Sequence, residues 1–349
     1  MINQPIFFER NRTFRVYLGG KLFSDFFGDA PEDGFFPEEW IASGVRALNK
    51  ESHGEREGVS RLKGLDLYFD DLLAQHKRAL LGTGEKLRIL VKILDSAIRL
   101  PAQAHPDRAF SKEHFHSEYG KTESWLILGT RPDAKIFFGF REDVKREDLV
   151  RAIEQSETEC DAMEELLLPI SPEVGEVYLV PAKTAHAIGK GCLILEIQEP
   201  TDFTIQPERW CGDYRLSDEE MYLGIDKEVA LDCFSFGATP KAKCEPLTTF
   251  VDNFSKIEEL IGEEQTDCFV IRRITLTGGE YEMALPDTYG IYIVIDGEGE
   301  ILECAPTAED SVWGTPYTHP LKKGDYFFLG ACAMGKYRLR GQLTVVECY

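Results

Sequence analysis

The stretch Leu100 to Asp107, with the sequence LPAQAHPD, places a glutamine and a histidine two residues apart among small and apolar residues. In an extended segment, residues i and i+2 point to the same side, so we expect Gln103 and His105 to face together. Pro106 ends the segment, because proline cannot donate to a strand ladder. Two polar side chains on one face of an apolar segment need a partner, and a metal ion is one candidate.

Two later segments offer further metal ligands. Glu123 lies at the start of an apolar stretch in GKTESW, and His186 follows a proline turn in VPAKTAHAIG. Together with Gln103 and His105 they give two imidazoles, one carboxylate and one amide oxygen, with no thiolate. Zn²⁺ fits this set best, and Fe²⁺ or Mn²⁺ are alternatives. Coordination positions left over would take water or substrate, as a catalytic site requires.

Each of these residues also has a purely structural interpretation. A lone His105 or His186 is more often a hydrogen-bonded core histidine, and a lone Gln103 is usually a surface or capping residue. Glu123 could be a solvated strand end. The His-Phe-His pattern at 114–116 also has metal-ligand spacing, but its polar neighbours favour a loop. Spacing alone therefore leaves the metal and the structural interpretations open.

The elements that must position these residues are expected to be mainly strands. Residues 64–82 have helical apolar spacing ended by a glycine, which predicts an amphipathic helix. The Ile-, Leu- and Val-rich run 86–100 predicts a buried strand, and 124–140 predicts two strands around a turn. Residues 145–170 are predicted to be helical. From residue 171 onward the alternation of short apolar runs with Gly and Pro turns indicates β structure.

The two β-rich halves share a local pattern. Residues 175–188 (GEVYLVPAKTAHAI) and 324–339 (GDYFFLGACAMGKYRL) both read as a Gly-acid pair, a strand, a turn of small residues and a second strand. This similarity predicts two related barrels. His186 has no counterpart in the second copy, so chemistry is expected in the first. A second helical piece is predicted near Lys256–Ile261.

Composition narrows the range of partners and compartments. The 349 residues include 39 Lys and Arg against 61 Asp and Glu, a net charge of −22, which disfavours nucleic acid and anionic membranes as partners. Nine scattered cysteines without a Cys-x-x-Cys motif indicate reduced thiols, and we detect no signal peptide or membrane-spanning apolar run. We therefore expect a cytoplasmic protein, as a monomer or homodimer, that acts on a small molecule.

Three motifs taken together resemble one known family. In order and spacing, LVKILDSAIRLPAQAHPD, GKTESW and PEVGEVYLVPAKTAHAIGKGCLILEIQEPTDFT are similar to the type I mannose-6-phosphate isomerases of the cupin superfamily. The resemblance covers most of residues 14–210, and YIVIDGEGEI with HPLKKGDYFFLGA resembles the second, metal-free cupin of that family. It implies a mainly β bicupin of two β-barrel or jelly-roll domains with helical additions. We place a catalytic domain at 1–235, with insertions at about 64–82 and 145–170, and a second domain at 236–349.

The resemblance also implies roles for individual residues. Gln103, His105, Glu123 and His186 would ligate a catalytic zinc, and Lys121 would lie beside the substrate. Glu196 and Asp202, in LEIQEPTDFT, match acidic positions of the family's pocket. Strand alternation supports Glu196, because it points away from its apolar neighbours Leu195 and Ile197. A buried structural carboxylate at Glu196 and a simple turn residue at Asp202 are the alternatives.

Aldose–ketose isomerisation moves a proton between C2 and C1 of the sugar through an enediol. The reaction needs an electrophile for the enediolate oxygens and a group that carries the proton. A divalent cation supplies the electrophile as a Lewis acid. For the proton we favour Asp202, assisted by Lys121. The predicted enzyme is a metal-dependent isomerase that interconverts mannose 6-phosphate and fructose 6-phosphate.

Two positions differ from the family pattern where the substrate phosphate would be bound. Pro101 stands where the family usually has a serine, and Gln206 stands where it usually has an arginine. A charged hydrogen bond contributes about 1.5–3 kcal/mol, so its loss would weaken phosphate binding. Gln206 and Arg209 are the predicted substrate-binding residues, with Arg209 as a candidate replacement for the missing arginine or else a surface residue beside Trp210. An unphosphorylated or differently phosphorylated sugar, or a non-catalytic sugar-binding bicupin, are therefore the alternative functions.

Overall fold

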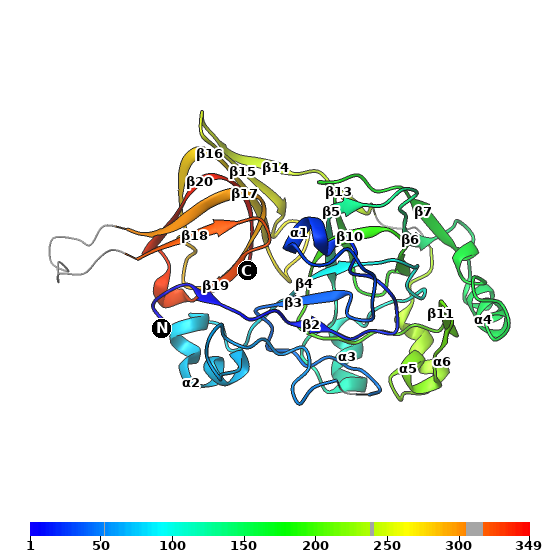
Figure 1. The fold of residues 1–349 in the computed structure, drawn as a ribbon. Helices are drawn as coiled ribbons and strands as arrows, with labels where there is room; N and C mark the ends of the chain where they lie inside the picture. The colour runs from blue at the N-terminus through cyan, green and yellow to red at the C-terminus, as the bar shows by residue number, and fades with distance from the viewer. Residues whose placement is uncertain (52, 238–240, 305–316) are drawn as a thin grey trace.

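The structure, a computed structural model, describes residues 1–51, 53–237, 241–304 and 317–349. It is mainly β, with one large sheet in each half of the chain (Figure 1). In spatial order, the first sheet consists of β13 (Lys243–Cys244), β8 (Val177–Val180), β5 (Glu123–Thr130), β10 (Cys192–Gln198), β4 (Leu90–Asp95), β3 (Glu38–Ile41) and β2 (Arg12–Thr13). A smaller sheet joins β7 (Leu167–Ile170), β6 (Ile136–Phe140) and β9 (His186–Ile188), and β11 (Trp210–Cys211) pairs with β12 (Tyr214–Arg215).

The second large sheet is built mostly from the C-terminal part of the chain. Its spatial order is β1 (Ile6–Phe7), β19 (Tyr326–Leu329), β17 (Gly290–Glu303), β20 (Tyr337–Cys348), β16 (Ile271–Glu282), β15 (Ser255–Ile261) and β14 (Leu247–Val251), with β18 (Thr318–Lys322) also paired to β17. The N-terminal strand β1 thus joins the C-terminal sheet, whereas β13, beyond residue 235, pairs with β8 of the first sheet. The domain division at residue 235 stays a prediction, with chain segments crossing it in both directions.

The helices are short and lie outside the sheets. They are α1 (Phe23–Phe27), α2 (Phe69–Leu81), α3 (Arg108–Phe115), α4 (Arg146–Gln155), α5 (Asp218–Tyr222) and α6 (Lys227–Ala230), with 3₁₀ turns at Glu164–Leu166, Leu231–Cys233 and Ala331–Ala333. Helix α2 buries Phe69 and Leu72 in a core cluster that also contains Val91 of the first sheet and Ile291 and Phe328 of the second. One of the apolar clusters is therefore shared by the two halves.

Most of the predicted elements are confirmed. Helix α2 falls within 64–82, β4 within 86–100, and β5 and β6 correspond to the two strands expected at 124–140. The prediction of helix through residue 170 is wrong after Gln155, because Leu167–Ile170 pairs with β6 as a strand.

The helix predicted near Lys256–Ile261 is also wrong. This segment is strand β15, hydrogen-bonded between β14 and β16. Its apolar residues Ile257, Leu260 and Ile261 have helical spacing, but pairing on both sides decides the conformation. Strand pairing also explains how the charged Glu258 can be buried. Its Oε2 lies 2.9 Å from Nε of Arg273, its partner on the neighbouring strand.

The central strands that carry the site are buried along their whole length. All residues of β4 and of β10 are buried, as expected for strands covered on both faces. The register places Lys92 of β4 directly opposite Glu196 of β10, so their side chains lie on the same face.

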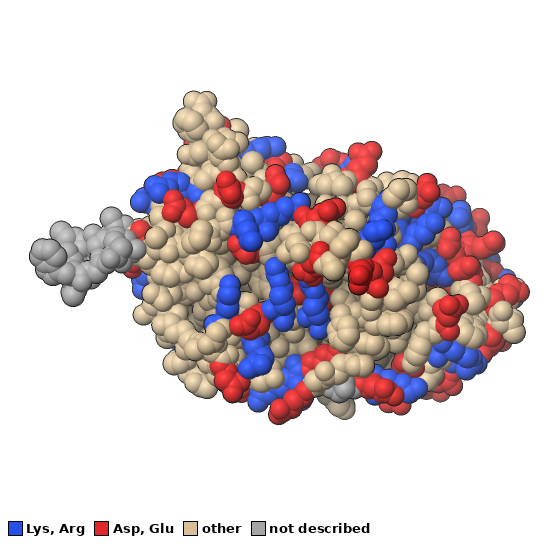
Figure 2. Space-filling view, viewed as in Figure 1, with Lys and Arg blue, Asp and Glu red and all other residues tan. Residues whose placement is uncertain are grey.

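On the molecular face shown in Figure 2, basic and acidic side chains lie interspersed rather than gathered by sign.

Candidate metal centre and cavity

Two histidines and a glutamate, distant in sequence, meet in the interior of the first half. His105 follows β4, Glu123 begins β5, and His186 begins β9. His105 Nε2 lies 3.1 Å from Glu123 Oε2, and His186 Nε2 lies 3.3 Å from Glu123 Oε1. One ligand atom from each residue lies within 4.8 Å of the others, and all three side chains are buried. Ligands about 2.0–2.2 Å from a tetrahedral Zn²⁺ would be about 3.3–3.6 Å apart, close to these spacings.

Backbone carbonyls orient both imidazoles. His105 Nδ1 donates to Phe203 O at 3.0 Å, and His186 Nδ1 donates to Thr184 O at 2.8 Å, which turns each Nε2 toward Glu123. Burial, together with the charge of Lys121, lowers the pKa of His105 to about 3. Burial likewise lowers the pKa of His186. Both rings are therefore neutral at physiological pH, the form that binds a metal ion.

Unsatisfied polar atoms indicate that the cluster is suited to a cation. Among the described residues, His186 Nε2 and Glu123 Oε2 are buried and form no hydrogen bond, although Glu123 Oε2 has ion-pair contacts with Lys121 Nζ and His105 Nε2. Leaving such atoms unpaired is costly, and a divalent cation between them would satisfy both. Gln103 forms an antiparallel backbone bridge with His186 and lines the same cavity as Glu123, so it lies beside the cluster, and its role as a fourth ligand stays a prediction. The cluster is thus a candidate site for a divalent metal.

Lys121 also belongs to this cluster. Its Nζ lies 3.0 Å from Glu123 Oε2 and 2.8 Å from His105 Nε2, and the side chain is 5% exposed. Lys121 precedes Glu123 by two residues, and its backbone N–H donates to Pro106 O at 2.9 Å, which fixes the backbone at this position. The structure therefore places Lys121 against two of the candidate ligands, and its predicted role beside the substrate stays a prediction.

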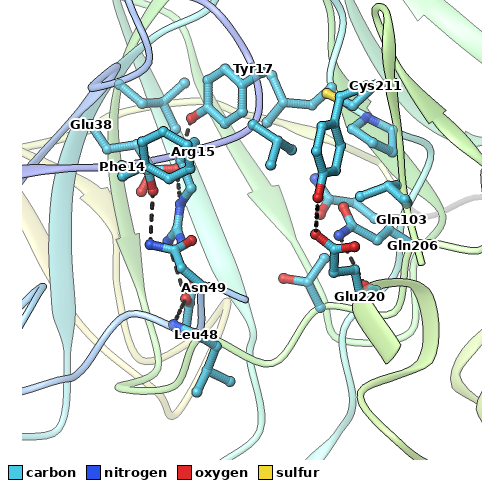
Figure 3. A pocket seen from close by; sticks show the side chains of 18 of the residues that line it. Phe14, Arg15, Tyr17, Glu38, Leu48, Asn49, Gln103, Gln206, Cys211 and Glu220 are labelled. Atoms are coloured by element: carbon cyan, nitrogen blue, oxygen red, sulfur yellow. Dashed lines mark hydrogen bonds and ion pairs between the residues drawn. The ribbon is translucent and has the colours of Figure 1, made fainter. Parts of the chain in front are cut away.

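The cluster lies at the wall of a cavity of about 750 Å³. Gln103, Lys121, Glu123, Glu196 and Asp202 all line it. Figure 3 shows the cavity from close by, with Gln103, Gln206 and Glu220 on one side and Arg15, Glu38 and Asn49 on the other. Such a volume is ample for a sugar phosphate.

A buried network of charges forms one side of the cavity. Lys92 Nζ lies 3.1 Å from Glu196 Oε1. Glu38 accepts hydrogen bonds from Arg15 Nε at 3.0 Å, from Tyr17 Oη at 2.7 Å and from Trp40 Nε1 at 2.7 Å. Burial alone would raise the pKa of Glu38, but the charges of Arg15 and Lys92 and these hydrogen bonds lower it to about 2.

The pKa of Glu196 is shifted in the opposite direction from that of Glu38. Its burial raises the pKa to about 7, although the ammonium of Lys92 acts to lower it. Glu196 Oε1 has no hydrogen-bond partner among the described residues, and Lys92 is its ion-pair partner. A carboxyl with a pKa near neutrality can both give and take a proton at physiological pH.

Asp202 is held firmly by the arginine of this same network. Arg15 Nη2 donates to both of its carboxylate oxygens at 3.1 Å, and the backbone N–H of Leu48 donates to Oδ2 at 2.9 Å. Arg15 Nη1 also donates to Asn49 Oδ1 at 3.0 Å. Asp202 therefore ties the segment around residues 48–49 to the cavity wall.

The two predicted substrate-binding residues have different surroundings. Gln206 lines the cavity, and its Nε2 donates to Glu220 O at 3.1 Å. Arg209 is not among the described residues that line the cavity. Its Nη2 lies 2.6 Å from Glu157 and 2.8 Å from Asp218, so its charge is already compensated elsewhere.

Sequence reasoning did not find Arg15, Tyr17, Glu38 or Lys92 as parts of the site. Lys92 carried a usable signal, because it is a single lysine inside the buried apolar run LVKILD. A charged residue in such a run needs a partner or a polar cavity. Arg15 and Tyr17 alternate in FRVYL and so share one face, but nothing local indicates that this face meets Glu38.

Among the described residues, the structure contains no helix that is both long and apolar enough to cross a membrane. The fold and the site define the class of protein: a mainly β protein with a candidate divalent-metal centre that opens into a cavity of metabolite size. No family model matches the chain.

Sequence and structure comparisons identify the family. The mannose-6-phosphate isomerase of Streptococcus mutans is 32% identical over 243 residues, which cover 68% of this chain and 70% of that protein. Mannose-6-phosphate isomerase ManA of Bacillus subtilis is 27% identical over 347 residues, 98% of this chain and 97% of that protein. A crystal structure of the mannose 6-phosphate isomerase from Bacillus subtilis superposes with a TM-score of 0.77 at 26% identity, over 99% of both chains. The chain belongs to the mannose-6-phosphate isomerase family.

Proposed function

We propose that the protein interconverts mannose 6-phosphate and fructose 6-phosphate through an enediol, with a divalent cation held by Gln103, His105, Glu123 and His186. The observation that carries the proposal is the buried His–Glu–His cluster, with its unsatisfied ligand atoms, at the wall of the cavity. The bound cation would supply Lewis-acid stabilisation of the enediolate oxygens. Zinc is the proposed metal, because the ligand set and the spacing suit it best.

The proton transfer is assigned to the cavity carboxyls. Glu196 and Asp202 both line the cavity, with Lys121 beside the ligands as a charge stabiliser. Asp202, which the sequence favoured, accepts hydrogen bonds from Arg15 and from Leu48, so both of its carboxylate oxygens are already engaged by the cavity wall. The raised pKa of Glu196, about 7, favours Glu196 as the proton carrier.

The proposal extends to the organisation and setting of the protein. The two β halves are proposed to be cupin barrels, with the metal site in the first and none in the second. All nine cysteines are free thiols, which supports the proposed reducing, cytoplasmic location. We propose a monomer or homodimer, which light scattering would distinguish.

The test is a coupled assay of purified, zinc-loaded protein with mannose 6-phosphate and, separately, with mannose. Chelation should abolish turnover, and His186→Ala should reduce both zinc content and turnover. His114→Ala is the matched control, because His114 lies on α3 outside the cluster. Sugar binding without turnover of either substrate would contradict the proposal and favour a non-catalytic sugar-binding protein.

Two substitutions separate the proposed acid–base roles. Glu196→Gln should keep the metal and lower kcat by at least about 100-fold, the contribution expected of a general acid–base group. Asp202→Asn should have the smaller effect on kcat. The reverse order would return the proton transfer to Asp202.

A further inference from the structure

A short backbone ladder leads from the metal cluster to a carboxylate on the cavity wall. Ala104 bridges Ile205 in antiparallel fashion, which sets Gln206 opposite Gln103. The backbone N–H of Gln206 in turn donates to Met221 O at 3.0 Å, and its side chain donates to Glu220 O at 3.1 Å. Glu220, the neighbour of Met221 in α5, lines the same cavity as Gln103 and Gln206.

The proposed substrate is long enough to contact separate parts of the cavity wall. Carbon–carbon bonds of about 1.5 Å put the phosphorus of a hexose 6-phosphate about 7 Å from C2. We place C1 and C2 of the sugar at the metal cluster and its phosphate end on the part of the cavity wall formed by Gln206 and Glu220. Figure 3 shows Gln103, Gln206 and Glu220 on the same side of the cavity.

The carboxylate of Glu220 is held in place and charged. Glu220 Oε2 accepts from the backbone N–H of Ser217 at 2.8 Å and from its hydroxyl at 2.6 Å, and Oε1 accepts from Tyr214 Oη at 2.8 Å. Burial would raise the pKa of Glu220, but these hydrogen bonds lower it below the ordinary value. A fixed negative charge thus faces the end of the cavity where a phosphate would lie.

The cations of the cavity differ in how firmly they are paired. Arg15, Lys92 and Lys121 each have a carboxylate oxygen within 3.1 Å. Lys50 also lines the cavity, and its ion pair with Glu220 Oε2 is long, at 3.9 Å, with the lysine side chain 59% exposed. Among the described lining residues, Lys50 is therefore the cation that a substrate phosphate can recruit most easily.

We propose that Glu220 is a specificity-determining residue that limits the preference for phosphorylated sugars. It competes with the phosphate for Lys50 and repels the phosphate dianion, while its carboxylate accepts a hydrogen bond from a neutral sugar hydroxyl. The enzyme therefore also isomerises the unphosphorylated aldose. This inference rests on the proposed isomerase function.

The experiment compares kcat/KM for mannose 6-phosphate with kcat/KM for mannose in four forms of the zinc-loaded protein. Relative to wild type, Glu220→Gln should raise the ratio of the two values at least ten-fold, and Lys50→Met should lower it at least ten-fold. Glutamine also serves at this position of a capping box, so α5 should remain folded, which circular dichroism would check. The fourth form, Lys77→Met with Glu85→Gln, removes an exposed ion pair of α2 and should leave the ratio unchanged.

The outcomes are separable. An unchanged or lower ratio in Glu220→Gln, with the wild type active, overturns the assignment of Glu220 and leaves the proposed function intact. If the wild type turns over neither sugar, the proposed function fails. In that case, calorimetry gives the affinity (1/Kd) for mannose 6-phosphate and for mannose, and the ratio of the two affinities replaces the ratio of kcat/KM values. The expected shifts in Glu220→Gln and Lys50→Met, and the refuting result, are the same.

Discussion

Lys92 provides a quantitative test of the buried charge network, through the substitution Lys92→Met. The side chain is 5% exposed, and its ammonium faces Glu196 Oε1 at 3.1 Å. At an effective dielectric constant of 20, the attraction across that distance is about 5 kcal/mol. Removing one partner of a buried pair typically costs about 3–5 kcal/mol, because the other charge is left uncompensated. Methionine keeps most of the side-chain volume, so packing adds little to this cost.

The pH dependence of this cost has a definite sign. The pKa of Glu196 is already raised to about 7 in the folded protein, and loss of the Lys92 ammonium should raise it further. Because the protonated carboxyl needs no counter-charge, the cost of Lys92→Met should be largest above pH 7. It should shrink as the pH falls toward the ordinary Glu value of about 4.3.

Urea denaturation of the metal-free protein at pH 8 and at pH 5 measures this cost. The control is the double variant Lys92→Met with Glu196→Gln, which removes both charges and should be more stable at pH 8 than Lys92→Met alone. A loss below about 1 kcal/mol at pH 8, or a double variant no more stable than the single one, would refute the reasoning.

Three other substitutions give further checks. The pKa of Glu38 is about 2 in the folded protein, which corresponds to about 3 kcal/mol of unfolding free energy at neutral pH. This contribution is lost as the pH falls from about 4.5 toward 2. The urea midpoints of wild type and Glu38→Gln should therefore converge over that range. Gly82→Ala should lower the melting temperature more than Gly28→Ala does. Both glycines have positive φ, but only at Gly82 would the new Cβ clash, at 2.1 Å from Asp287 O. Equal losses in melting temperature would contradict the steric argument. Arg209→Met should destabilise the protein but change KM for mannose 6-phosphate less than two-fold, because its guanidinium is compensated outside the cavity; a ten-fold rise in KM would restore it as a substrate-binding residue.

The sequence predicted the elements and residues whose signal is local. Alternation along LPAQAHPD directed attention to Gln103, which bridges His186, and to His105, which belongs to the cluster, and glycine and apolar spacing located helix α2. The metal cluster also needed the family resemblance, because Glu123 and His186 are distant in sequence and their approach depends on strand pairing.

What the sequence did not predict depends on long-range contacts. The partners of Lys92 and Glu38 come from other strands or from the N-terminal segment, so neither role follows from neighbouring residues. The distance in sequence between Arg209 and Asp202 does not indicate which way the guanidinium turns, and in the structure it pairs with Glu157 and Asp218, so substrate binding by Arg209 stays a prediction. The segment Lys256–Ile261 failed for a similar reason, since pairing with β14 and β16 outweighed its helical spacing.

The most direct test of the central claim is the rate at which the purified protein converts mannose 6-phosphate to fructose 6-phosphate before chelation, after chelation and after reloading with stoichiometric zinc. We predict turnover that is lost with the metal and restored by zinc, and that is absent in His186→Ala at every step. Turnover that survives complete removal of metal, or that His186→Ala retains, would contradict the assignment of the His–Glu–His cluster as the catalytic metal centre.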